Sequence, residues 1–212
     1  MKTIAVISQK GGAGKTTIAI HLAVASSLDG QNTAIIDLDP QASSAKWSDR
    51  RLQLSDVPVV LSVHASRLKT EMNRVESNAG DILFIDTAPH SDSAALEAAK
   101  AADLILVPCK PSILDLEAIS STIDLVSTTG KPIFVVLNAV GASVKERDDA
   151  REAIRELGVE VCDTYLSQRV AFSRALITGQ TAQEFEPTGK ARGEVDSLHA
   201  FVCAHIQEAE TA

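Results

Sequence analysis

Short apolar runs alternate along the chain with longer amphipathic segments. The apolar runs predict strands at 3–8, 33–37, 58–63, 81–86, 103–108 and 132–138, with a further candidate at 160–165. The segments between them predict helices at 15–28, 41–53, 65–78, 92–101, 113–127, 144–157 and 192–208. Steady alternation of strand and helix is typical of βαβ units in a parallel sheet. We therefore expect an α/β fold in which a mostly parallel twisted sheet is flanked by helices on both faces, within a single domain over residues 1–212.

The composition agrees with such a sheet and limits the surfaces that the protein presents. Hydrophobic residues make up 45% of the chain and aromatic residues only 3%, so the core must be built from Ala, Val, Ile and Leu. The net charge of −8 is the opposite of what a protein that binds nucleic acid over its whole surface carries. Any contact with DNA must therefore come from a local basic patch.

The apolar runs do not indicate a membrane span, and the cysteines do not indicate an oxidising compartment. No run approaches the roughly 20 apolar residues that are needed to span a bilayer. The three cysteines, Cys109, Cys162 and Cys203, show neither metal-ligand spacing nor a disulfide framework. We therefore expect a protein of the reducing cytoplasm without membrane contact.

A glycine-rich segment follows the first predicted strand and opens the first predicted helix. Its residues are Lys10, Gly11, Gly12, Ala13, Gly14, Lys15, Thr16 and Thr17. Strand, glycine-rich turn and helix are the context of a phosphate-binding loop, in which backbone N–H groups approach phosphate oxygens. Lys15 is expected to bridge the β- and γ-phosphates, Thr16 to ligate Mg²⁺, and Thr17 to reach the region of the α-phosphate. One departure stands out, since Gln9 occupies a position where the general pattern has glycine.

Carboxylates end two of the predicted strands and suit a magnesium site. Asp37 and Asp39 are two residues apart, so on a strand both side chains point to one face, toward the loop. Asp86 ends the apolar run 82–85, as the acid of a Walker B strand does, and is expected to hold a magnesium-bound water. The alternative role for these three acids is helix capping. Asn138 lies at the end of the sixth predicted strand. It either contacts the base of a bound nucleotide or belongs to a simple turn.

Three segments together resemble the ParA/MinD family of deviant Walker ATPases, and most closely the short ParF-type ParA partition proteins. They are the phosphate loop with its extra Lys10, the run Asp-Leu-Asp-Pro-Gln at 37–41, and Pro-Ser-Ile-Leu-Asp at 111–115. The resemblance covers essentially the whole chain. It implies ATP as the nucleotide, Lys10 reaching across a dimer interface to the partner's ATP, Asp39 positioning the attacking water, and Asp37 supporting the magnesium shell. Lys10, Lys15 and Asp39 are thus the expected catalytic residues, and Asn138 the expected adenine contact.

The same resemblance implies partners. ATP would close a homodimer, the dimer would bind non-specific DNA and associate with the nucleoid, and a ParB- or ParG-like adaptor would stimulate hydrolysis and release. The expected DNA contacts are Arg169, Arg174, Lys190 and Arg192. Segment 165–192 holds these four basic residues and two acidic residues, whereas residues 193–212 hold four acidic residues and neither Lys nor Arg. Solvated helix faces and salt bridges are the alternative reading of this segment.

The function predicted from the sequence is therefore ATP-driven partition of DNA or positioning of another intracellular cargo. Two alternatives stay open. A MinD-like membrane regulator would need a basic amphipathic C-terminal helix, but residues 198–208 carry neither Lys nor Arg. A metabolic P-loop enzyme or iron–sulfur carrier is the other alternative; a carrier would need paired cysteines at a dimer axis, and no second cysteine pairs visibly with Cys109.

Overall fold

The structure is a computed structural model that describes residues 1–208. In these residues seven strands form one sheet in the order β3-β2-β4-β1-β5-β6-β7, and every pair of neighbours is parallel. The strands are β1 (Lys2–Val6), β2 (Thr33–Asp37), β3 (Val59–Ser62), β4 (Ile82–Asp86), β5 (Leu104–Cys109), β6 (Ile133–Leu137) and β7 (Glu160–Val161). The predicted parallel sheet is confirmed.

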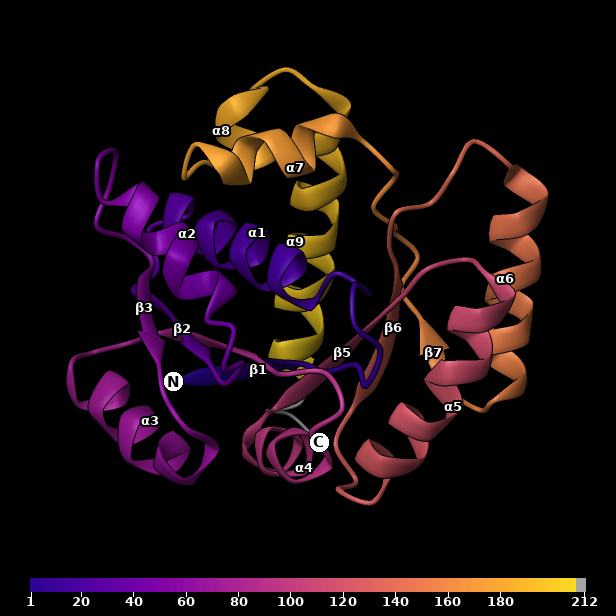
Figure 1. Cartoon of the computed structure of the whole chain (residues 1–212), viewed down its shortest axis with the longest axis horizontal. Coiled ribbons are helices and arrows are strands. Elements are labelled where there is room, and N and C mark those ends of the chain that lie inside the picture. Colours follow the sequence, from indigo (N-terminus) through magenta and orange to yellow (C-terminus); the bar gives the residue numbers. More distant parts are fainter. Residues whose placement is uncertain (209–212) are drawn as a thin grey trace.

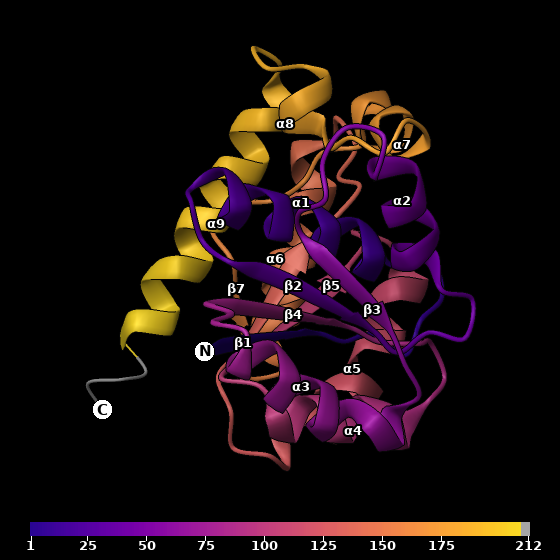
Figure 2. The ribbon, with the colours of Figure 1, turned by 90° about the vertical axis from the view of Figure 1, so that its left-hand side faces the viewer.

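Helices cover both faces of the sheet, as expected. One layer contains α1 (Lys15–Leu28), α2 (Ser43–Arg51), α7 (Val170–Ile177), α8 (Ala182–Phe185) and α9 (Lys190–Glu208). The other contains α3 (Leu68–Ser77), α4 (Asp92–Ala101), α5 (Ile113–Ser127) and α6 (Val144–Glu156). Figures 1 and 2 show the sheet between these two layers. Within the described range, no helix is both long enough and apolar enough to cross a membrane.

Two apolar cores lie on opposite faces of the sheet. Along β1, Ile4 and Val6 belong to the core under α1 and α9, whereas Ala5 belongs to the core above α4 and α5. This alternation is the two-residue period of a strand. The central strands β2, β4 and β5 are buried along their whole length, as continuous apolar strands in a parallel sheet are.

The predicted helix positions hold, with differences at the ends and in the last third of the chain. The segment predicted at 65–78 is a 3₁₀ turn, Ala65–Arg67, followed by α3, and the strand candidate at 160–165 pairs only over Glu160–Val161. Helices α7 and α8 were not predicted. They are short, and α8 depends on a capping box between Thr181 and Glu184 rather than on a periodic apolar stripe.

Candidate nucleotide-binding site

The glycine-rich loop joins β1 to α1 at the carboxyl end of the sheet. Gly12 and Gly14 have φ angles of 75° and 106°, which side-chain-bearing residues rarely adopt. A Cβ on Gly14 would also collide with the amide of Asn138. Because Gly14 stands at the N-cap of α1 and has no side chain, the first N–H groups of the helix are left to a ligand. This is the geometry of an anion site at a helix N-terminus.

Lys15 brings a positive charge into this loop. Its side chain is buried, and its ammonium donates to the carbonyl oxygens of Ser8 at 2.9 Å and Lys10 at 3.3 Å. Burial lowers the pKa of Lys15, and the negative charges of Asp86 and Asp39 partly offset that effect. The ammonium is thus held inside the loop, where the sequence predicts the β- and γ-phosphates.

Asp86 and Thr16 meet beneath the loop. The Thr16 hydroxyl donates to Asp86 Oδ2 at 2.7 Å, and the Ser44 hydroxyl donates to the same oxygen at 2.8 Å. Burial, followed by the nearby charge of Asp37, raises the pKa of Asp86 to about 7. In the described part of the chain Asp86 Oδ1 is buried without a hydrogen-bond partner. A hydroxyl oxygen beside a carboxylate with one free oxygen fits the hard-oxygen preference of Mg²⁺.

Asp37 and Asp39 both lie at the carboxyl end of β2, but they make different contacts. Asp37 is fully buried, and it accepts the backbone N–H of Asp39 at 2.9 Å and that of Ser44 at 2.9 Å. Burial raises its pKa. Asp39 is partly exposed and accepts the backbone N–H of Gln41 at 2.8 Å. Asp37 therefore shapes the loop and the start of α2, as the capping alternative describes, while Asp39 is the acid that faces solvent. The magnesium role of Asp37 and the water-positioning role of Asp39 stay predictions.

Lys10 is held by its own chain. Its ammonium lies 3.0 Å from Asp115 Oδ1, and the Ser112 hydroxyl donates to Asp115 Oδ2. Asp115 is mostly buried at the first turn of α5, whereas Lys10 is about one-third exposed. The sequence marked the segment 111–115 but gave Asp115 no role. The pairing places Lys10 beside its own phosphate loop, and its predicted reach to a second subunit stays a prediction.

Asn138 and Thr17 also contact the loop and its helix. The Asn138 amide donates to the Ala13 carbonyl oxygen at 2.7 Å. The Thr17 carbonyl oxygen accepts from His21 Nδ1 at 2.7 Å. Asn138 thus supports the phosphate loop, and its adenine contact stays a prediction. Ser44 is the residue at this site that sequence reasoning missed, because a serine early in a helix carries no signal of its own.

The four predicted DNA contacts are not brought onto one face. Arg169 pairs with Glu194 at 2.6 Å, and both line a groove together with Lys190. Arg192 instead pairs with Asp196 at 3.2 Å and lines a separate, acidic cavity. Residues 190 and 192 are about 200° apart around α9, so the structure separates Lys190 from Arg192, and a role of these residues in DNA binding stays a prediction. Arg174 and Lys190 are exposed, and neither makes an ion pair with the side chains that the structure describes.

Comparisons with known proteins agree with this geometry. The family model of the CobQ/CobB/MinD/ParA nucleotide binding domain matches residues 4–182. Maintenance of carboxysome distribution protein A of Gloeobacter kilaueensis is 29% identical over 198 residues, which cover 92% of this chain and 90% of that protein. Protein ParA of Rhizobium radiobacter is 23% identical over 213 residues, 96% of each chain. The septum site-determining protein MinD of Pyrococcus horikoshii, solved with Mg-ADP, has a TM-score of 0.77 at 18% identity over 95% of both chains.

The sheet order and the loop define the class as a P-loop nucleotide-binding protein. The family model covers most of the chain, so the chain belongs to the CobQ/CobB/MinD/ParA nucleotide-binding family, and the predicted ParA/MinD relationship is confirmed.

Proposed function

We propose that this protein is a ParA-like ATPase that positions a cargo, DNA or another large body, in the cytoplasm. ATP binding would close a homodimer that holds non-specific DNA, and an adaptor protein would stimulate hydrolysis and release. The observation that carries the proposal is the grouping of Lys15, Thr16 and Asp86 around the glycine loop, with a second lysine, Lys10, beside it. Relatives named for ParA and for carboxysome distribution, which match nearly the whole chain, support positioning as the role.

The residues have separate tasks in this proposal. Lys15 and the loop N–H groups bind the β- and γ-phosphates, and Thr16 and Asp86 hold Mg²⁺ and its water. Bound Mg²⁺ neutralises charge on the phosphate oxygens. Asp39 orients the attacking water. Lys10 leaves Asp115 and, in the dimer, places its charge against the partner's γ-phosphate, as an arginine finger does. Turnover by the protein alone is slow, because positioning depends on a long-lived ATP state.

Binding to DNA depends on nucleotide in this account. The test is co-sedimentation of the protein with non-specific duplex DNA in ATP, ADP or no nucleotide. ATP-dependent binding that weakens as salt rises is the expected result, because phosphate contacts release counterions. The double variant Arg174→Ala with Lys190→Ala should lose this binding, whereas Arg192→Ala, on the acidic cavity, is the matched control and should keep it. If ATP promotes no DNA binding, the DNA role fails, and liposomes become the next surface to try for a MinD-like regulator.

A further inference from the structure

The first turn of α2 lies against the carboxylate that is expected to serve magnesium. Ser44 is fully buried; its hydroxyl donates to Asp86 Oδ2 at 2.8 Å, and its backbone N–H donates to Asp37 Oδ2 at 2.9 Å. Asp37 and Asp86 face each other as register partners at the ends of β2 and β4. One residue of α2 therefore contacts both buried carboxylates at this edge of the sheet.

The hydroxyl of Ser44 is not used to cap its helix. Serines near a helix start usually accept from the free backbone N–H groups of the first turn. Here the Asp37 carboxylate accepts those N–H groups, from Ser44 at 2.9 Å and from Ala45 at 3.4 Å. The Ser44 side chain is thereby free to donate to Asp86 instead. Its contact with Asp86 therefore needs a reason other than the stability of α2.

Two donors on a single oxygen fix the orientation of the Asp86 carboxylate. Thr16 donates to Oδ2 from the phosphate loop and Ser44 donates to the same oxygen from α2. Oδ1 is left as the oxygen without a partner in the described part of the chain. A carboxylate held in this way presents one defined oxygen to a ligand. Residues that hydrogen-bond to the ligands of a metal fix the orientation of those ligands in the same way.

We propose that Ser44 is a positioning residue of the magnesium site, holding the Asp86 carboxylate so that Oδ1 stays free for a magnesium-bound water. The proposal rests on the proposed Mg-nucleotide function. It adds to the site a residue that lies outside both the phosphate loop and the acidic strand ends.

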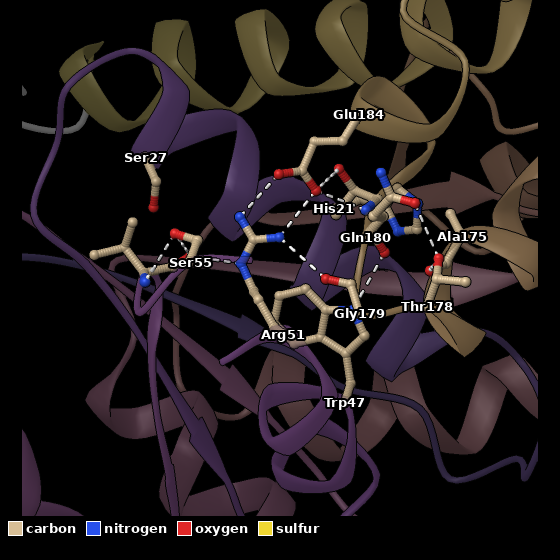
Figure 3. A network of polar contacts seen from close by, with 12 residues as sticks. His21, Ser27, Trp47, Arg51, Ser55, Ala175, Thr178, Gly179, Gln180 and Glu184 are labelled. Atoms are coloured by element: carbon tan, nitrogen blue, oxygen red, sulfur yellow. Dashed lines mark hydrogen bonds and ion pairs between the residues drawn. The ribbon is translucent and has the colours of Figure 1, made fainter. Parts of the chain in front are cut away.

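The rest of α2 is anchored independently of the Ser44 hydroxyl. Trp47 is buried, and its indole N–H donates to the Gln180 carbonyl oxygen at 3.2 Å. The Arg51 guanidinium donates to both carboxylate oxygens of Glu184, at 2.9 and 3.0 Å (Figure 3). Because these contacts hold the far end of α2, Ser44→Ala removes the bond to Asp86 without releasing the helix. The variant is therefore a clean test of positioning.

The experiment is calorimetric titration of ADP into the full chain, once with Mg²⁺ and once with EDTA. Four proteins are compared: wild type, Ser44→Ala, Ser44→Thr and Ser43→Ala. Ser43 is exposed and precedes Ser44, so it is the matched control. Emission of Trp47, the one tryptophan of the sequence, checks that α2 is packed in every variant.

Wild type should bind ADP more tightly with Mg²⁺ than with EDTA. In EDTA, Ser44→Ala should bind ADP with the affinity of wild type. In Mg²⁺, the factor by which the metal increases its affinity for ADP should be roughly tenfold smaller than in wild type, as is common when an outer partner of a metal site is removed. Ser44→Thr should restore the gain, and Ser43→Ala should never lose it. A full gain in Ser44→Ala overturns the proposal, as does an equal loss in Mg²⁺ and EDTA, which marks a structural role. A wild-type protein that binds no ADP in either condition overturns the proposed function itself, so the two failures are distinguishable.

Discussion

We expect one buried histidine to make the free energy of unfolding depend on pH. His21 is 1% exposed in α1, its Nδ1 donates to the Thr17 carbonyl oxygen at 2.7 Å, and its Nε2 accepts the Ala182 backbone N–H at 3.1 Å. The neutral ring with its proton on Nδ1 satisfies both contacts. Protonation of Nε2 would replace this acceptor by a donor that faces the backbone N–H of Ala182, and the buried ring is shielded from solvent. Burial accordingly lowers the pKa of His21 from 6.5 to about 4.

The sign and size of the effect follow from this shift. Between pH 6.5 and 4 the unfolded chain binds a proton at His21 that the folded chain does not, so stability is lost as pH falls through this window. At 1.36 kcal/mol for each pKa unit, the loss is about 2 kcal/mol at pH 5 and roughly 3 kcal/mol near pH 4. Asp86 works in the opposite direction, because its pKa is raised to about 7. A comparison of two proteins that both contain Asp86 cancels its contribution.

The assay is urea unfolding followed by Trp47 emission at pH 7.5 and pH 5.0, for wild type and His21→Gln. Glutamine offers one donor and one acceptor in place of the two ring nitrogens but does not titrate. We expect the free energy of unfolding of His21→Gln, measured relative to wild type, to improve by about 2 kcal/mol between pH 7.5 and pH 5.0. Parallel pH profiles of the two proteins would refute the reasoning, since they would mean that His21 binds its proton equally in both states.

Three further changes test the packing and the lysine contact. Arg51→Met should lower the free energy of unfolding in urea by about 3 kcal/mol, because it leaves the partly buried Glu184 charge without its partner; a loss under 1 kcal/mol would contradict this. Gly179→Ala should cost about 1–3 kcal/mol and lower the melting temperature, because Gly179 has a φ of 73° and an added Cβ would lie 2.6 Å from the backbone nitrogen of Arg51; an unchanged melting temperature would count against it. Asp115→Ala should free Lys10 and tighten ATP-dependent self-association by roughly two- to fivefold, the range expected for a partly exposed ion pair; sedimentation that shows weaker association would show that Asp115 supports the dimer instead.

The sheet and the phosphate loop were predictable because their signals are local. Glycines of the loop stand at fixed spacing before Lys15, and Asp86 ends an apolar run, so each is visible in a short stretch of sequence. Strands β2, β4 and β5 are buried on both faces, which is why their sequences are mostly apolar runs. Helices 15–28, 92–101 and 113–127 were predicted with the bounds that the structure has.

Two contacts that sequence reasoning missed join residues far apart in the chain. Ser44 reaches Asp86 across 42 positions, and Arg51 reaches Glu184 across 133. No spacing rule connects such pairs, because the fold and not the local pattern brings them together. The sequence also grouped Lys190 with Arg192, because a net charge counted along a segment ignores the direction in which each side chain of α9 points.

Sedimentation velocity tests the central claim, an ATP-dependent switch between monomer and dimer, most directly. With Mg²⁺ present, the account predicts a dimer of wild type in ATP and a monomer in ADP. Asp39→Ala should stay a dimer in ATP because it binds nucleotide but does not hydrolyse it, and Lys15→Ala should stay a monomer throughout. If wild type and Asp39→Ala are both monomers at saturating ATP, the switch and the role assigned to Asp39 are contradicted together.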